Sequence, residues 1–162
     1  MQRLILLRHA EAQVRASSGH DIDRALTAAG EAMAARVGAA LMADENWPDI
    51  ALVSNAVRAE ETWTVARESF PKCPVEFRLE LYNAGPETVL AAARARAEAT
   101  VLVIGHNPGL QALALDLLRQ QGTSAALAAR VEARFPPATA ATFSFDADGR
   151  PELERLLMGT VG

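Results

Sequence analysis

The sequence of 162 residues has a single cysteine, Cys73, and a single lysine, Lys72. One cysteine excludes an intrachain disulfide framework and any zinc site built from several cysteines. The apolar run at the N-terminus is too short for a signal peptide and is interrupted by Arg8. No stretch approaches the roughly 18 apolar residues of a membrane span. We therefore expect a cytoplasmic protein that does not act at a membrane.

Aromatic residues are also scarce, since five Phe, two Trp and one Tyr make up 5% of a chain that is 50% hydrophobic. The core must therefore be built from small and branched aliphatic side chains. The net charge of −4 argues against a nucleic-acid partner, because such proteins normally present a basic face. The length fits one domain spanning residues 1–162. Almost all cations are arginines, which suit forked contacts to phosphate.

Short apolar segments alternate along the chain with longer helical patterns. The expected strands are 3–7, 50–54, 101–105 and 141–145, with a weaker one at 75–78. The expected helices are 27–43, 58–70, 86–98 and 108–121, and Thr27 is the expected N-cap of the first. Segment 122–133 is either a surface helix or an irregular connection. This alternation predicts a three-layer α/β/α domain with a mainly parallel central sheet.

Ligands of such sheets bind just beyond the carboxyl ends of the strands. Arg8 and His9 follow the first expected strand, Arg58 follows the second, and His106 follows strand 101–105. Each of these residues alone has a structural interpretation, as a packed histidine, a salt-bridged arginine or part of a turn. Because all of them point to the same rim, the sequence predicts an anion or phosphate site there.

This set of side chains suits phosphoryl transfer. Two arginines can grip phosphoryl oxygens with paired N–H donors, and a neutral imidazole is a good nucleophile toward phosphorus. Nearby guanidinium groups should disfavour the imidazolium form of the attacking histidine. A second histidine can donate hydrogen bonds to the transferred group. Such a site needs neither a metal nor a cofactor.

The motifs that hold these residues resemble those of the histidine phosphatase superfamily. They are Leu7-Arg8-His9-Ala10 (with Ala for the usual Gly), Asp23-Arg24-x-Leu26-Thr27-x-x-Gly30, Ser54-x-Ala56-x-Arg58-Ala59-x-x-Thr62 and Gly105-His106-Asn107-Pro108. The resemblance implies a phosphoglycerate mutase-like fold. The short chain and the form Arg-His-Ala-Glu-Ala are similar to the SixA-type phosphohistidine phosphatases.

By this resemblance, His9 is the phosphorylated nucleophile, and Arg8, Arg58 and His106 complete the phosphate pocket. Larger relatives add an acidic proton donor, for which Glu80 is the candidate; the alternative for Glu80 is a solvated or salt-bridged carboxylate. A serine or sugar alkoxide needs such an acid to leave. A phosphohistidine's imidazole leaves more easily, so a missing acid would narrow the range of substrates.

The expected substrate is a phosphohistidine on another protein, such as a phosphotransfer domain. Two alternatives remain open: a phosphatase of small phosphomonoesters that uses the same chemistry, and a non-catalytic phosphate-binding protein of this fold. We reject a cysteine phosphatase, because Cys-x5-Arg would require arginine where Leu79 stands. Asp21-Ile22-Asp23 does not follow a strand, as an aspartyl nucleophile would, and no P-loop occurs. His20 lies in an expected loop, with contact to substrate as the alternative.

Overall fold

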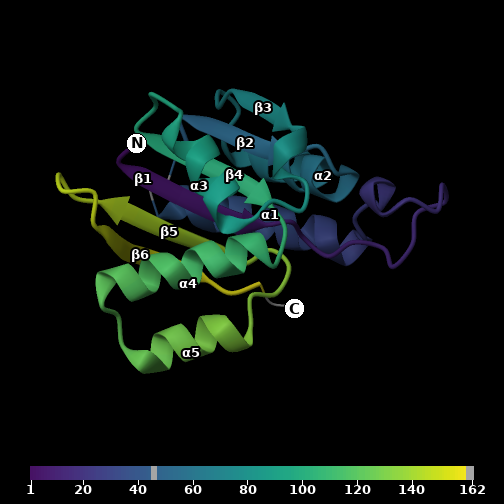
Figure 1. The fold of residues 1–162 in the computed structure, drawn as a ribbon. Helices are drawn as coiled ribbons and strands as arrows, with labels where there is room; N and C mark the ends of the chain where they lie inside the picture. The colour runs from purple at the N-terminus through teal and green to yellow at the C-terminus, as the bar shows by residue number, and fades with distance from the viewer. Residues whose placement is uncertain (45–46, 160–162) are drawn as a thin grey trace.

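The computed structural model describes residues 1–44 and 47–159, so residues 45–46 and 160–162 of the predicted domain lie outside the described part. Its sheet has the strand order β3-β2-β4-β1-β5-β6 (Figure 1). The strands are β1 (Arg3–Arg8), β2 (Ile50–Ser54), β3 (Val75–Arg78), β4 (Thr100–Gly105), β5 (Ala140–Phe145) and β6 (Pro151–Leu157). The first four strands run parallel to one another, whereas β5 is antiparallel to β1 and β6 is antiparallel to β5. The predicted mainly parallel sheet is confirmed.

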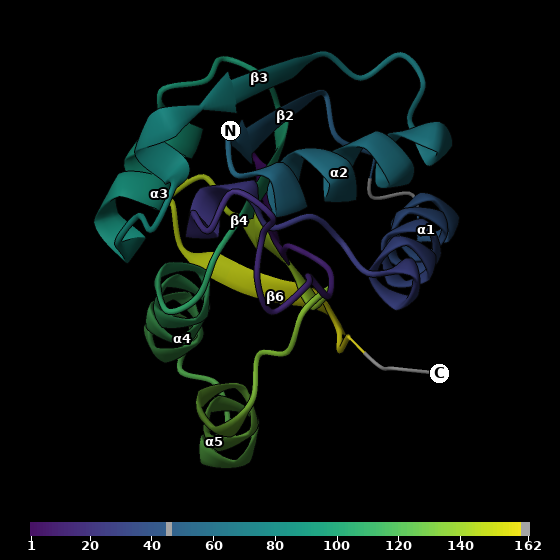
Figure 2. The same cartoon turned by 90° about the vertical axis from the view of Figure 1, so that its right-hand side faces the viewer.

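Helices cover both faces of this sheet (Figure 2). They are α1 (Ala28–Ala43), α2 (Val57–Ala66), α3 (Pro86–Arg94), α4 (Gly109–Gln121) and α5 (Ala125–Ala133). Because successive side chains of a strand point to opposite faces, Leu4 and Leu6 pack toward α3 and α4, whereas Ile5 and Leu7 pack toward α1 and α2. The predicted three-layer α/β/α arrangement is confirmed. None of the described helices is long and apolar enough to cross a membrane.

The boundaries of several elements differ from those expected. The helix predicted at 58–70 ends at Ala66 and continues as a 3-10 turn, Arg67–Ser69. The helix predicted at 86–98 ends at Arg94, and segment 122–133 contains the helix α5. Strand β6 was not predicted, because its run of Glu, Leu and Arg is also typical of a helix. The expected N-cap is confirmed, since the Thr27 hydroxyl accepts the N–H of Gly30 at 3.0 Å.

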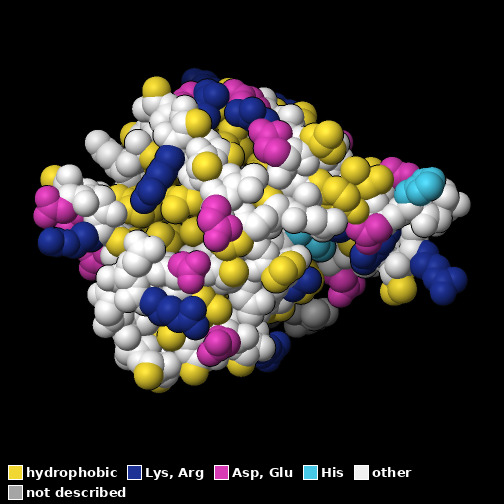
Figure 3. Space-filling view, viewed as in Figure 1, with side chains coloured by type: hydrophobic (Ala, Val, Ile, Leu, Met, Phe, Trp, Pro, Cys, Tyr) yellow, Lys and Arg dark blue, Asp and Glu magenta, His cyan; other side chains and the backbone are white. Residues whose placement is uncertain are grey.

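Many of the arginines form ion pairs with carboxylates at the surface. Arg3 pairs with Glu154 at 2.8 Å, and Arg96 pairs with both Glu76 and Glu98 at 2.9 Å. In the face shown in Figure 3, basic and acidic side chains are accordingly interspersed. The basic side chains on this face therefore lie among acidic ones.

Candidate active site

The carboxyl ends of β1 and β4 place two histidines side by side. These strands are neighbours with Arg8 opposite Gly105, so His9 and His106 follow at the same level. The His9 N–H donates to the Gly105 carbonyl at 3.0 Å, and the two imidazole centroids lie 5.1 Å apart. Arg58, in the first turn of α2, donates from Nε to His9 Nε2 at 3.3 Å. The structure thus brings together Arg8, His9, Arg58 and His106, which we call the central cluster.

The hydrogen bonds of His9 assign its tautomer. His9 Nδ1 lies 2.7 Å from the Ala10 carbonyl oxygen, which can only accept, so Nδ1 carries the hydrogen. Nε2 then holds the lone pair, which accepts the Arg58 Nε–H. The side chain is 8% exposed, so little water competes for these contacts. The arrangement presents Nε2 as the nucleophilic atom of a neutral imidazole.

The environment of the cluster keeps both histidines neutral. Burial lowers the pKa of His9 to about 4, assisted by the charges of Arg58, Arg8 and Arg24 and opposed by the hydrogen bond to Ala10. Burial is likewise the largest cause that lowers the pKa of His106 to about 3, and the charges of His9 and Arg58 lower it further. The sequence predicted this direction from the arginines, but desolvation is the larger cause.

Two donors of the cluster are buried without a partner among the described residues. His106 Nε2 lies 2.8 Å from the Ser54 hydroxyl, which itself accepts the Ala56 N–H at 3.3 Å. Among the described residues, His106 Nε2 is the acceptor within reach of the Ser54 hydroxyl, so we assign the Ser54 hydrogen to Nε2 and the His106 hydrogen to the unpartnered Nδ1. Arg8 Nε is the second such donor. Because unsatisfied buried donors are costly, these N–H groups favour a bound anion.

The C-terminal third of the chain holds the β1 end of the cluster in place. Arg8 Nη1 donates to the Phe135 carbonyl at 2.7 Å, and Asn107 Nδ2 donates to the same oxygen at 3.0 Å. The Ala138 N–H reaches the carbonyls of both Arg8 and His9 at 3.1 Å. The loop before β5 therefore fixes the backbone and the guanidinium that flank the His9 imidazole.

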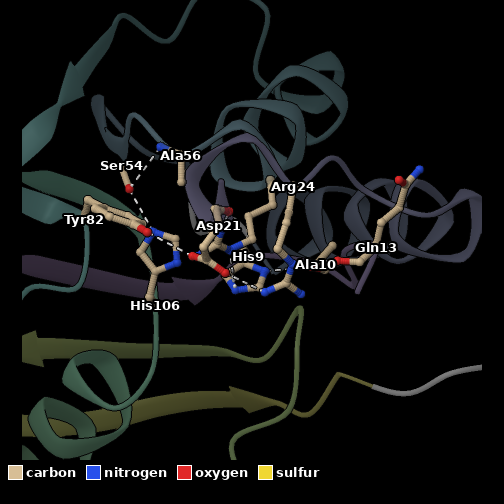
Figure 4. Close-up of polar contacts among 10 residues, drawn as sticks. His9, Ala10, Gln13, Asp21, Arg24, Ser54, Ala56, Tyr82 and His106 are labelled. Atoms are coloured by element: carbon tan, nitrogen blue, oxygen red, sulfur yellow. Dashed lines mark hydrogen bonds and ion pairs between the residues drawn. The ribbon is translucent and has the colours of Figure 1, made fainter. Parts of the chain in front are cut away.

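Two residues at the cluster were not identified from the sequence. The Asp21 carboxylate accepts from Arg58 Nη2 at 3.0 Å and from the Tyr82 hydroxyl at 2.9 Å (Figure 4). The Tyr82 ring meets the His106 ring edge-on, with centroids 5.6 Å apart. Tyr82 follows β3. It could therefore have been found in the same way as the histidines, from its position beyond the carboxyl end of a strand. Asp21 lies in the long loop after β1, and its sequence context, Asp21-Ile22-Asp23, suggests only an aspartyl nucleophile, which the lack of a preceding strand rejects.

Among the described residues, no hydrogen bond or ion pair joins the other sequence candidates to the central cluster. Glu80 is exposed on the 3-10 turn after β3, and its carboxylate accepts from Arg78 at 3.2 Å, in line with the salt-bridged alternative. His20 is exposed. Burial and the charge of Asp49 raise the pKa of the Cys73 thiol to about 11, which disfavours a thiolate nucleophile. Within residues 1–44 and 47–159, no group of three or more His, Cys, Asp or Glu side chains could hold a metal ion.

The lowered pKa values predict that the protein loses stability as the pH falls. Unfolded histidines titrate near pH 6.5, whereas His9 and His106 do so at about 4 and about 3 in the fold. Between about pH 6.5 and 4, the unfolded state therefore binds more protons, and the free energy of unfolding decreases toward acid. Urea unfolding at pH 7, 6 and 5 measures this slope.

The double variant His9→Gln/His106→Gln should show a flatter pH dependence than the native chain. His20→Gln is the matched control, because it removes an exposed histidine and should leave the slope unchanged. Equal slopes for the native chain and the double variant would contradict the assignment of this pH dependence to the two buried rings.

Comparison with known proteins relates this geometry to a family. Residues 4–85 match the model of the histidine phosphatase superfamily (branch 1). An uncharacterized protein of Mycobacterium tuberculosis (strain ATCC 25618 / H37Rv) is 36% identical over 118 residues, which cover 72% of this chain and 73% of the relative. The SixA structure from Agrobacterium tumefaciens superposes with a TM-score of 0.83 at 30% identity, covering 96% of this chain and 97% of that one. SixA from Nakamurella multipartitia gives 0.84 at 28% identity, with 98% and 96% covered.

Proposed function

The chain belongs to the histidine phosphatase superfamily and is a SixA-type phosphatase with a histidine nucleophile, and from this premise we propose that it removes phosphate from a histidine of another protein. The observation that carries the proposal is the central cluster itself. A neutral imidazole, whose Nε2 lone pair accepts from Arg58, lies beside two buried donors that have no partner among the described residues, Arg8 Nε and His106 Nδ1.

In the proposed reaction, the phosphoryl oxygens bind Arg8 Nε–H, His106 Nδ1–H and N–H groups of Arg58. Bound phosphate draws the Arg58 donor away from His9 Nε2 and frees its lone pair. His9 Nε2 then attacks phosphorus, and the bond to the leaving group breaks with its electron pair on the leaving atom. Water hydrolyses the resulting phosphohistidine on His9 and regenerates the imidazole. Side chains supply all the positive charge, so we propose that the reaction needs no metal.

The leaving group decides which substrates react well. Glu80, the proton donor suggested by resemblance, pairs with Arg78 at the surface. A serine alkoxide without a proton donor is a poor leaving group. The imidazole of a phosphohistidine leaves readily once its other nitrogen is protonated, and an aryl oxide is also a good leaving group. The site therefore suits phosphohistidine best, and phosphohistidine phosphatase is also the name given to the SixA relative from Agrobacterium tumefaciens.

A substrate panel tests this proposal. The protein, without added metal, is incubated with a phosphohistidine peptide, a phosphoserine peptide and p-nitrophenyl phosphate, each with and without a chelator. We expect turnover of the first and third substrates, little turnover of phosphoserine, no effect of the chelator, and an acid-labile phosphoenzyme. Faster turnover of phosphoserine than of phosphohistidine would instead favour a phosphatase of small phosphomonoesters. Phosphate binding without turnover of any substrate would indicate a non-catalytic protein.

A further inference from the structure

The Asp21 carboxylate lies at the boundary between the central cluster and solvent. The Arg58 side chain is 5% exposed, whereas the Asp21 side chain that pairs with it is 50% exposed. Asp21 Oδ1 accepts from Arg24 at 2.9 Å, and Oδ2 accepts from Arg58 and Tyr82 (Figure 4). Asp21 also borders a surface pocket of about 360 Å³. The carboxylate is therefore in contact with both the buried guanidinium of the cluster and solvent.

The loop that carries Asp21 is tied to the body of the protein at several points. A β-bridge joins Ala12 to Leu26 at its base, and the Leu26 N–H donates to Glu61 Oε2 at 2.6 Å. The Asp21 carbonyl also accepts from Arg58 Nη1 at 2.7 Å. Because backbone contacts hold this position, the side chain can be changed without releasing the loop.

Asp21 places a negative charge in a site built for an anion. Hydrogen bonds from Arg24 and Tyr82 are the largest causes that lower its pKa to about 2; burial opposes them, and the charge and hydrogen bond of Arg58 add to them. The carboxylate is therefore ionised at neutral pH, and it is close enough to the cluster to act on the pKa of His106. Such a charge repels a phosphomonoester dianion and attracts a cation next to the phosphoryl group.

We propose that Asp21 is a specificity-determining residue, which favours phosphohistidine over phosphomonoesters by accepting a hydrogen bond from the protonated ring of the leaving imidazole. The inference rests on the proposed function and names the part of the substrate that is recognised. The phosphoryl group occupies one ring nitrogen, and the other carries the N–H that Asp21 accepts. When His9 Nε2 attacks, the P–N bond breaks and its electron pair stays on the ring nitrogen. The ring leaves as neutral imidazole and keeps its other hydrogen, so no proton has to be transferred.

Asp21→Asn tests the charge while it keeps the size of the side chain and an amide oxygen that can accept from Arg58. We compare kcat/KM of the native chain and the variant on a phosphohistidine peptide and on p-nitrophenyl phosphate. A hydrogen bond to a charged group corresponds to a change of about tenfold to a hundredfold. We expect the ratio of kcat/KM on phosphohistidine to kcat/KM on the aryl phosphate to fall by that factor.

Asp23→Asn is the matched control, because Asp23 accepts from the Ser18 hydroxyl at 2.7 Å and lies on the same turn. It should leave the ratio of the two kcat/KM values unchanged. If Asp21→Asn lowered kcat/KM equally on both substrates, Asp21 would be a positioning residue for Arg58 and the inference would be overturned. No change of kcat/KM on either substrate would also overturn it. If the native chain turns over p-nitrophenyl phosphate but not phosphohistidine, both the proposed function and this inference are rejected.

Discussion

His9→Ala is expected to lower kcat by on the order of 10⁴-fold or more on every substrate, since loss of a covalent nucleophile has effects of that size in other enzymes. The variant keeps the buried donors of Arg8 and His106, so it should still bind inorganic phosphate. No acid-labile phosphoenzyme should form. Quenched-flow with ³²P-labelled substrate measures the phosphoenzyme directly, and steady-state turnover of p-nitrophenyl phosphate measures kcat.

His20→Ala is the control for this experiment, because it removes an exposed histidine outside the central cluster. It should retain native turnover and phosphoenzyme. If His9→Ala kept full activity, or still formed an acid-labile phosphoenzyme on another residue, His9 would not be the nucleophile. The attacking atom is also specified: Nδ1 donates its hydrogen to the Ala10 carbonyl, so Nε2 is the ring nitrogen whose lone pair can attack phosphorus.

Arg58→Ala should lower kcat/KM by about 10²–10³-fold, the range found when one donor to a developing charge is removed. The guanidinium makes contacts that a single ammonium cannot reproduce together. Its Nε donates to His9 Nε2 at 3.3 Å, while Nη1 and Nη2 donate to the Asp21 carbonyl and carboxylate at 2.7 and 3.0 Å. Arg58→Lys should therefore recover only a small part of the loss, although it restores the charge.

Kinetics of both variants on p-nitrophenyl phosphate, with thermal unfolding as a check on the fold, measure these effects. Arg67→Lys is the matched control, since Arg67 follows the same helix at an exposed position and should retain native values. If Arg58→Ala kept a near-native kcat/KM, or if Arg58→Lys restored the native value, the paired N–H contacts of the Arg58 guanidinium would have no part in the mechanism.

The central cluster could be predicted because its position follows from topology. Parallel strands end at one edge of a sheet, so residues that follow β1, β2 and β4 converge there whatever the details of packing. Asp21 could not be predicted in this way. It reaches Arg58 through a loop without hydrophobic periodicity, and the two residues are 37 positions apart.

Other features were missed for different physical reasons. Phe135 contributes its backbone carbonyl to the site, and no residue type signals that role. Strand β6 begins with Pro151 and carries charged residues on an edge, which is how edge strands resist pairing with other chains, but the same composition suits a helix. The ends of the helices α2 and α3 were placed too late, because their Ala, Arg and Glu residues favour helix beyond the point where tertiary contacts end it.

The Phe135 carbonyl also has a consequence for how the protein is made. The four cluster residues all precede Gln121 in the chain. The Phe135 carbonyl, which accepts from both Arg8 and Asn107, follows 14 residues after Gln121 and 127 residues after Arg8. Strand β5, which lies beside β1 in the sheet, follows later still. A nascent chain on the ribosome therefore carries all the cluster residues before it can hold them in place.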